Sequence, residues 1–60
     1  MAMVALPQGT GWHFINSEKI VAIKFAAPKK TVVFLEGGVQ VEVTEETHSV
    51  RKRIDDAAGQ

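Results

Sequence analysis

The alternation of apolar and polar residues predicts a β-hairpin over residues 31–43. Valines alternate with polar residues over 39–43, which is typical of a strand with one apolar and one wet face. Residues 32–35 form an unbroken apolar run instead, which indicates a strand covered on both faces. Between the two strands lie Gly37 and Gly38, and such a pair accepts the positive φ angles of a two-residue type I′ turn.

Further strands are predicted upstream of this hairpin. Residues 12–15 form a short strand, and the polar cluster 16–18 forms a turn that leads into a longer strand over 19–27. Simple alternation along 19–27 places odd-numbered residues on one face and even-numbered residues on the other. Residues 1–6 are a candidate edge strand that ends at Pro7, because proline cannot donate to a ladder.

After the hairpin, the apolar period changes to that of a helix. Thr47, Val50, Ile54 and Ala57 recur at spacings of three and four residues, which places them in a narrow stripe along one helical face. Thr44 is the expected N-cap, and the glutamates that follow it favour the positive end of a helix. The sequence therefore predicts one C-terminal helix.

Strands followed by a helix indicate an α+β fold, in which the helix covers one face of a small antiparallel sheet. We expect a β-meander of three to four strands and then the helix. The alternative is a small all-β barrel that buries its second apolar face within itself. The whole chain, residues 1–60, is expected to be a single domain, with residues 1–8 and 56–60 as loose ends.

A chain of 60 residues has limited means of stabilising a core. Such a chain buries only about 60% of the surface that its unfolded state exposes. Cysteine is absent, which excludes disulfides and thiolate metal sites. Self-association is the remaining common support, so we expect a homo-oligomer. The candidate self-association face, the second face of the sheet, consists of Ile20, Ala22, Val32 and Phe34.

The distribution of charge narrows the classes of partner. The formal net charge is zero, which argues against a generic binder of phosphate backbones. Lysines predominate before residue 36 and glutamates over residues 36–46, so opposite patches on two copies could dock against each other. No apolar run approaches the roughly 20 residues of a membrane span. The chain start lacks the basic region of a secretory signal, which favours a cytoplasmic protein without membrane insertion.

No residues stand at a spacing typical of catalysis. We find no readable nucleophile–base pair, carboxylate pair or metal cluster, so we expect neither an enzyme nor a cofactor. The chain is therefore interpreted as an interaction or regulatory protein that acts through protein–protein contacts with itself and with a protein partner.

The alternative function is that of a small nucleic-acid-binding regulator. Trp12 and Phe14 share one face of their strand and could stack on bases, although aromatic residues in a protein short of core are expected to be buried. The basic residues of this alternative patch are Lys29, Lys30, Arg51, Lys52 and Arg53.

A set of residues between positions 11 and 54 also matches the pattern of a known family. These residues are Phe14-Ile15-Asn16, Ile20, Ile23, Pro28, Thr31-Val32, Leu35, Gly38, Val43, Glu45, Val50 and Ile54. In them the chain resembles the small FlbD/SwrD family of flagellar and swarming-motility proteins. The loop around Pro28 is longer than the family's, and Glu46 stands where the family usually has serine. The resemblance implies a non-enzymatic cytoplasmic accessory protein linked to motility, with no catalytic residue.

Overall fold

The computed structural model describes residues 2–59 and has the α+β architecture expected from the sequence. Its described elements are the strands β1 (Met3–Gln8), β2 (Gly11–Asn16), β3 (Ile20–Ala27), β4 (Lys30–Leu35) and β5 (Val39–Val43), the short 3-10 helix η1 (Ser17–Lys19) and the helix α1 (Thr47–Ala58). The C-terminal helix is confirmed, and the described part has five strands rather than three or four. The strands do not close into the alternative barrel. Neither described helix has the length and apolar character needed to cross a bilayer.

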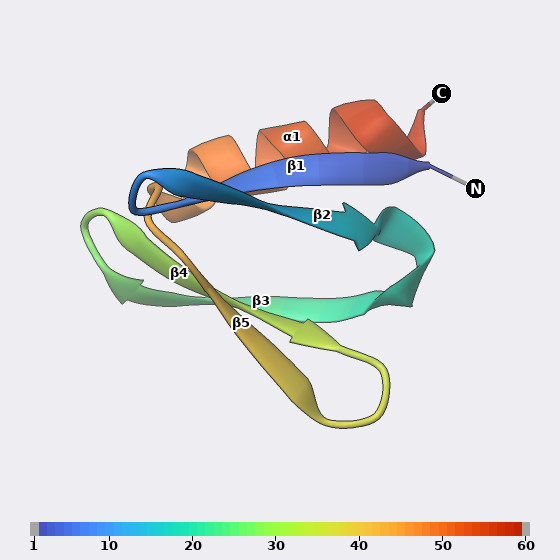
Figure 1. Ribbon diagram of the computed structural model, residues 1–60, viewed down its shortest axis with the longest axis horizontal. Coiled ribbons are helices and arrows are strands. Elements are labelled where there is room, and N and C mark those ends of the chain that lie inside the picture. The colour runs from blue at the N-terminus through green and yellow to red at the C-terminus, as the bar shows by residue number, and fades with distance from the viewer. Residues whose placement is uncertain (1, 60) are drawn as a thin grey trace.

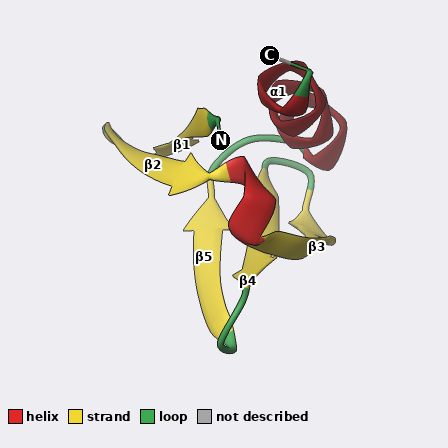
Figure 2. Cartoon of the chain, turned by 90° about the vertical axis from the view of Figure 1, so that its right-hand side faces the viewer, coloured by secondary structure: helices red, strands yellow, loops and turns green. Residues whose placement is uncertain are grey.

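The strands form two antiparallel sheets instead of one. β1 pairs with β2, and β3, β4 and β5 form a three-stranded sheet with β4 in the centre. The β1–β2 hairpin and α1 both lie over one side of the three-stranded sheet (Figures 1 and 2). One backbone hydrogen bond joins the two sheets where β5 ends, because Thr44 N donates to the carbonyl oxygen of Pro7 at 3.0 Å. The hairpin and the helix therefore cover the same face of the three-stranded sheet.

The hydrophobic core lies where the hairpin, the sheet and the helix meet. Leu6 of β1, Val33 of β4 and Val50 of α1 are fully buried. Ile54 and Ala57 pack against this cluster, so the apolar stripe expected along the helix is confirmed. Among residues 2–59, the buried apolar residues are Val4, Leu6, Ile15, Val33, Val43 and Val50.

The two chain ends are more ordered than the loose ends expected over 1–8 and 56–60. β1 contributes Val4 and Leu6 to the core, and α1 extends to Ala58. Pro7 lies within β1 rather than ending it. It is tolerated there because its carbonyl oxygen, and not the missing N–H, makes the bond to the end of β5. Residues 1 and 60 of the expected loose ends lie outside the described part.

The helix begins later than its expected N-cap at Thr44. The hydroxyl of Thr44 instead accepts a hydrogen bond from Gly9 N at 2.9 Å, and Glu46 occupies the N-cap position without a side-chain cap. The start of the helix is held by Thr31 of β4, which is fully buried. Thr31 Oγ1 donates to the carbonyl oxygen of Glu45 at 2.9 Å and lies 3.0 Å from Thr47 Oγ1. A tertiary contact thus replaces the local cap.

The loop between β4 and β5 is longer than the predicted turn. Gly37 and Gly38 have φ angles of 86° and 79°, so the expected positive φ values are confirmed. Leu35 pairs with Val39, however, which leaves three residues in the loop instead of two. The extra residue is Glu36, whose N–H donates to the carbonyl oxygen of Lys19 at 2.9 Å and so leaves the β4–β5 ladder.

Two valines of β5 test the position of the core. Val43→Ala is expected to lower the free energy of unfolding by about 2 kcal/mol, because it deletes buried methyl groups and leaves a cavity. Val39→Ala is the matched control, since Val39 is 51% exposed, and it is expected to cost less than about 0.5 kcal/mol. Urea denaturation followed by circular dichroism measures both losses. Equal losses would contradict the assignment of Val43 to the core.

Candidate functional site

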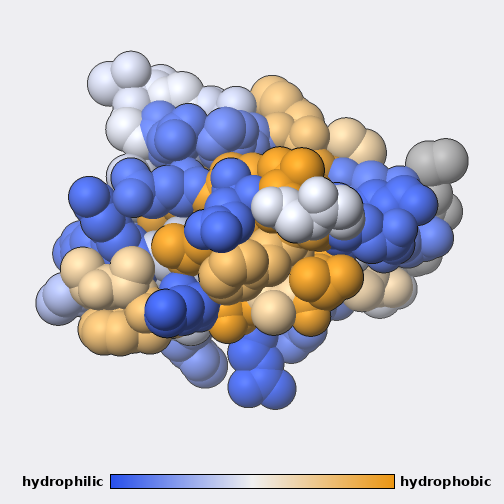
Figure 3. Space-filling model, turned by 90° about the horizontal axis from the view of Figure 1, so that it is seen from below, coloured by the Kyte–Doolittle hydropathy of each residue, from blue (hydrophilic) through white to orange (hydrophobic). Residues whose placement is uncertain are grey.

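The face of the three-stranded sheet opposite α1 carries an apolar centre. Antiparallel pairing places Phe34 beside Ala22, and Val32 between Lys24 and Glu42. Seen from this side, hydrophobic residues gather in the middle of the molecule and hydrophilic residues surround them (Figure 3). We call this face the sheet surface. It consists of the apolar residues Val21, Ala22, Val32 and Phe34 and the polar residues Lys24, Lys30, Gln40 and Glu42.

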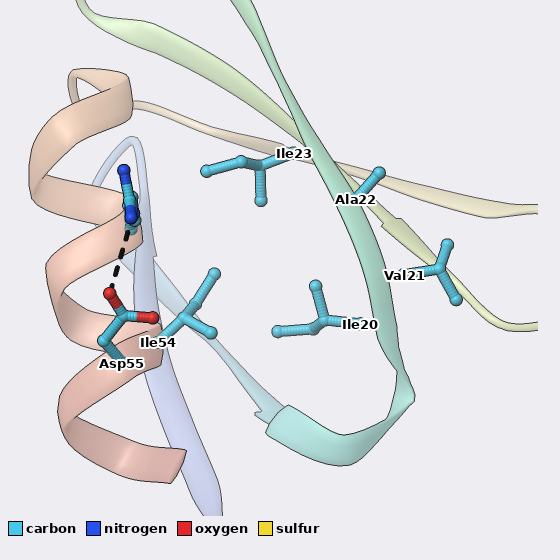
Figure 4. Close-up of a pocket in the computed structure, with 7 residues that line it drawn as sticks. Ile20, Val21, Ala22, Ile23, Ile54 and Asp55 are labelled. Carbon is cyan, nitrogen blue, oxygen red and sulfur yellow. Dashed lines mark ion pairs between the residues drawn. The ribbon is translucent and has the colours of Figure 1, made fainter. Parts of the chain in front are cut away.

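A β-bulge in β3 changes which residues reach the sheet surface. Ile20 pairs with Leu35 and Ala22 pairs with Phe34, so Val21 is an extra residue in its strand. The bulge breaks the simple alternation that the sequence predicted for residues 19–27. Ile20 and Ile23 consequently point toward α1, whereas Val21 and Ala22 point away from it (Figure 4).

The predicted self-association face is therefore only partly assembled. Ala22, Val32 and Phe34 lie together on the sheet surface, but Ile20 packs against the core. Val21, which is 65% exposed, lies beside Ala22 in its place. The sequence alone did not reveal Val21, because a bulge depends on how β3 and β4 pair.

An open groove runs between β3 and α1, with a volume of about 250 Å³. Residues 20–23 form one wall, and Arg51, Ile54 and Asp55 form the other (Figure 4). Arg51 Nε lies 3.6 Å from Asp55 Oδ2, so the two charges of the groove face each other. Apart from Arg51 and Asp55, the residues that line the groove are aliphatic, so the lining contains no nucleophile beside a base.

The outer face of the β1–β2 hairpin forms a second apolar surface. Trp12 and Phe14 are 54% and 69% exposed, so the expectation that they are buried is wrong. The hairpin turns its other face, with Leu6 and Ile15, into the core, and within residues 2–59 no element lies over its outer face. We call this face the hairpin surface. It consists of Met3, Ala5, Pro7, Trp12 and Phe14.

Arg53 links the hairpin surface to the helix. Its guanidinium carbon lies 5.7 Å from the centroid of the Trp12 ring, within the range of a cation–π interaction. Its Nε and Nη2 donate to the two carboxylate oxygens of Glu45 at 2.7 and 3.0 Å. The hydrogen bond to Glu45 raises the pKa of Arg53 above its ordinary value, so the guanidinium keeps its charge.

The residues of the alternative nucleic-acid patch do not form one uncompensated basic surface. Besides the pair of Arg53 with Glu45, Arg51 pairs with Asp55, and Lys30 Nζ lies 3.8 Å from Glu42 Oε1. Lys29 lies in the turn between β3 and β4, and Lys52 lies on α1. Within residues 2–59, no carboxylate is within 4.0 Å of either of these two lysines. Exposed aromatic rings are thus present, but most of the positive charge is already neutralised.

His13 lies on the inner side of the β1–β2 hairpin. It pairs with Leu6, and its Nε2 is buried without a hydrogen-bond partner in the described part of the chain. The residues that the structure describes contain no group of His, Cys, Asp and Glu arranged to hold a metal ion. Comparisons with protein-family models, curated proteins and solved structures found no match. The FlbD/SwrD resemblance therefore stays a prediction, and the two apolar surfaces are the candidate functional sites.

The link between Arg53 and Trp12 can be tested through Trp12 fluorescence, since Trp12 is the chain's single tryptophan. Glu45→Gln weakens the bidentate pair that holds Arg53 over the ring, so iodide should quench Trp12 more strongly than in the unmodified protein. We expect a loss of stability of about 0.5–1 kcal/mol. Glu46→Gln, at the next position, is the matched control and should leave quenching unchanged. Equal quenching in the two variants would contradict the proposed contact.

Proposed function

We propose that this chain is a non-enzymatic cytoplasmic interaction protein that acts through protein–protein contacts as a homo-oligomer. The observation that carries the proposal is the balance of buried and exposed apolar residues. In the described part, six apolar residues are buried and six large ones are more than half exposed. The exposed residues are Met3, Trp12, Phe14, Val21, Phe25 and Val39. Single exposed apolar residues are ordinary, but grouped ones mark interaction sites.

The composition of the hairpin surface supports contact with protein. Trp12, Phe14 and Met3 are of residue types enriched in protein–protein interfaces, where large rings supply contact area at little entropic cost. The pairing of β1 with β2 is regular, and no element of the described part lies over this face, so the exposure does not come from a local distortion of the strand. A protein partner that covers this surface would remove apolar area from water, which is favourable.

The remaining chemistry supports binding more than catalysis. The groove between β3 and α1 offers aliphatic walls and an internally paired Arg51 and Asp55. A regulatory or accessory role suits a small chain whose main distinguishing feature is its exposed apolar surface. The link to motility implied by the FlbD/SwrD resemblance belongs to this proposal. The proposal also includes a protein partner of unspecified identity.

Association can be measured directly by light scattering coupled to size-exclusion chromatography. We expect the average mass to exceed the 6.5 kDa of one chain and to rise with concentration between about 5 and 500 μM, the range of a weak interface. The same measurement with added salt separates apolar from charged contributions. A mass of one chain throughout this range would contradict the proposed homo-oligomer.

Nucleic-acid binding is the outcome that would replace this proposal, and Trp12 reports on it. We expect no change in tryptophan emission when single-stranded DNA or RNA oligonucleotides are added at low salt, because three basic residues of the patch already have carboxylate partners. Saturable quenching that disappears as salt rises would instead show stacking supported by phosphate contacts.

A further inference from the structure

The charges of the sheet surface have opposite signs at its two edges. Lys24 of β3, Val32 of β4 and Glu42 of β5 pair in one row across the three strands. Val32 occupies the middle, so the lysine and the glutamate lie one strand to either side of it. Ala22, Phe34 and Gln40 form the neighbouring row, which carries no charge. The surface therefore has an apolar centre at Val32 and Phe34 of β4, with Lys24 at one edge and Glu42 at the other. Lys30 at the start of β4 is paired with Glu42.

We infer that a second copy of this chain docks face to face on the sheet surface. The two copies are related by a two-fold axis that lies between them and runs parallel to β4. This inference deepens the proposed homo-oligomer and rests on it. Rotation about that axis lays β3 of one copy over β5 of the other. Lys24 of each copy then meets Glu42 of the other, so the contact forms twice. Val32 and Phe34 meet their own counterparts at the apolar centre. Lys30 at the start of β4 also meets its counterpart, and Glu42 of its own chain, 3.8 Å away, offsets the repulsion. The sheet surface thus complements itself in the placement of Lys24 and Glu42 and in its apolar centre.

The charges also select this axis over the other symmetric arrangement. A two-fold axis perpendicular to the strands lays β3 over β3 and β5 over β5. Lys24 then faces either the same lysine or Ala22, and neither arrangement forms an ion pair. Opposite charges steer partners into register, so the two Lys24–Glu42 contacts favour the axis along β4, although this axis also brings the two Lys30 side chains near each other.

The dimensions of packed sheets allow the contact. Sheets pack about 10 Å apart and are rotated by about 30°, which displaces a strand about 4.8 Å from the axis by only about 2.5 Å. The extended side chains of Lys24 and Glu42 can together span such a gap. Lys24 has no carboxylate within 4.0 Å in residues 2–59, whereas Glu42 makes one exposed contact with Lys30 at 3.8 Å. Lys24 can thus pair with the second copy without breaking a contact in its own chain.

The size of the sheet surface sets the strength of the association. Three strands of about six residues span roughly 14 by 20 Å, or about 300 Å² on each copy. The total of about 600 Å² is smaller than the roughly 1,200 Å² that bounds weak and transient complexes, so the sheet surface alone supports only weak association. We therefore expect a dimer that forms in the micromolar range or above. The hairpin surface belongs to a different sheet and stays open to another partner.

Charge reversal provides the test. Lys24→Glu and Glu42→Lys each turn two attractive contacts into two repulsive ones, so each variant alone should dimerise at least tenfold more weakly than the unmodified chain. An equimolar mixture of the two variants should recover dimers, because the acidic variant then faces the basic one in both contacts. Sedimentation velocity measures the dissociation constants. Lys52→Glu and Asp56→Lys on α1 make the same changes of charge away from the sheet surface, and they should leave the dimer unaffected.

The outcomes separate this inference from the proposed function. Recovery on mixing supports the two-fold axis along β4, and it also shows that both variants are folded. If the unmodified chain associates but the variants associate equally well, or if mixing fails to recover dimers, the axis is wrong while the homo-oligomer stands. If circular dichroism shows that either variant is unfolded, Lys24→Gln and Glu42→Gln replace the charge-reversal variants. Each of these is expected to weaken dimerisation threefold, about 0.65 kcal/mol. A strictly monomeric unmodified chain overturns both proposals.

Discussion

The contact of Leu6, Val33 and Val50 is the interaction on which the rest of the structure depends. These fully buried side chains come from the hairpin, the three-stranded sheet and the helix, so one cluster joins all three layers. Its formation uses the inner face of every element. Within residues 2–59, no further element covers the outer faces. The exposed apolar surfaces are therefore a direct consequence of how the core is made.

Polar contacts between distant segments then determine where the elements begin and end. Thr31 lies in the core and satisfies its hydroxyl at the start of α1, and Thr44 ties the end of β5 to the β1–β2 turn. A buried hydroxyl without a partner would be costly, so these bonds favour one arrangement of the layers over others. They also explain why the helix starts after Glu46 although its side chain makes no cap.

The two uncovered surfaces differ in a way that suits different tasks. The hairpin surface presents Trp12 and Phe14 with a single cation, Arg53, held beside it by Glu45. The sheet surface presents aliphatic residues and Phe34 between charges of opposite sign. The second pattern is self-complementary, whereas the first is not. In the proposed function, the sheet surface would bind a second copy of the chain and the hairpin surface would bind a protein partner.

Local patterns in the sequence predict the α+β class, the central hairpin with its two positive-φ glycines, and the apolar stripe from Thr47 to Ala57. Each of these depends on a local period or a local backbone preference. The exposure of Trp12 and the exchange of Ile20 for Val21 on the sheet surface depend instead on contacts between elements. The burial of a side chain depends on which layer lies over it, and a bulge depends on the register of two strands. Neither is encoded in the spacing of residues along one strand. The register of β3 with β4 places Val21 on the sheet surface, and the packing of the hairpin's inner face against the sheet leaves Trp12 exposed.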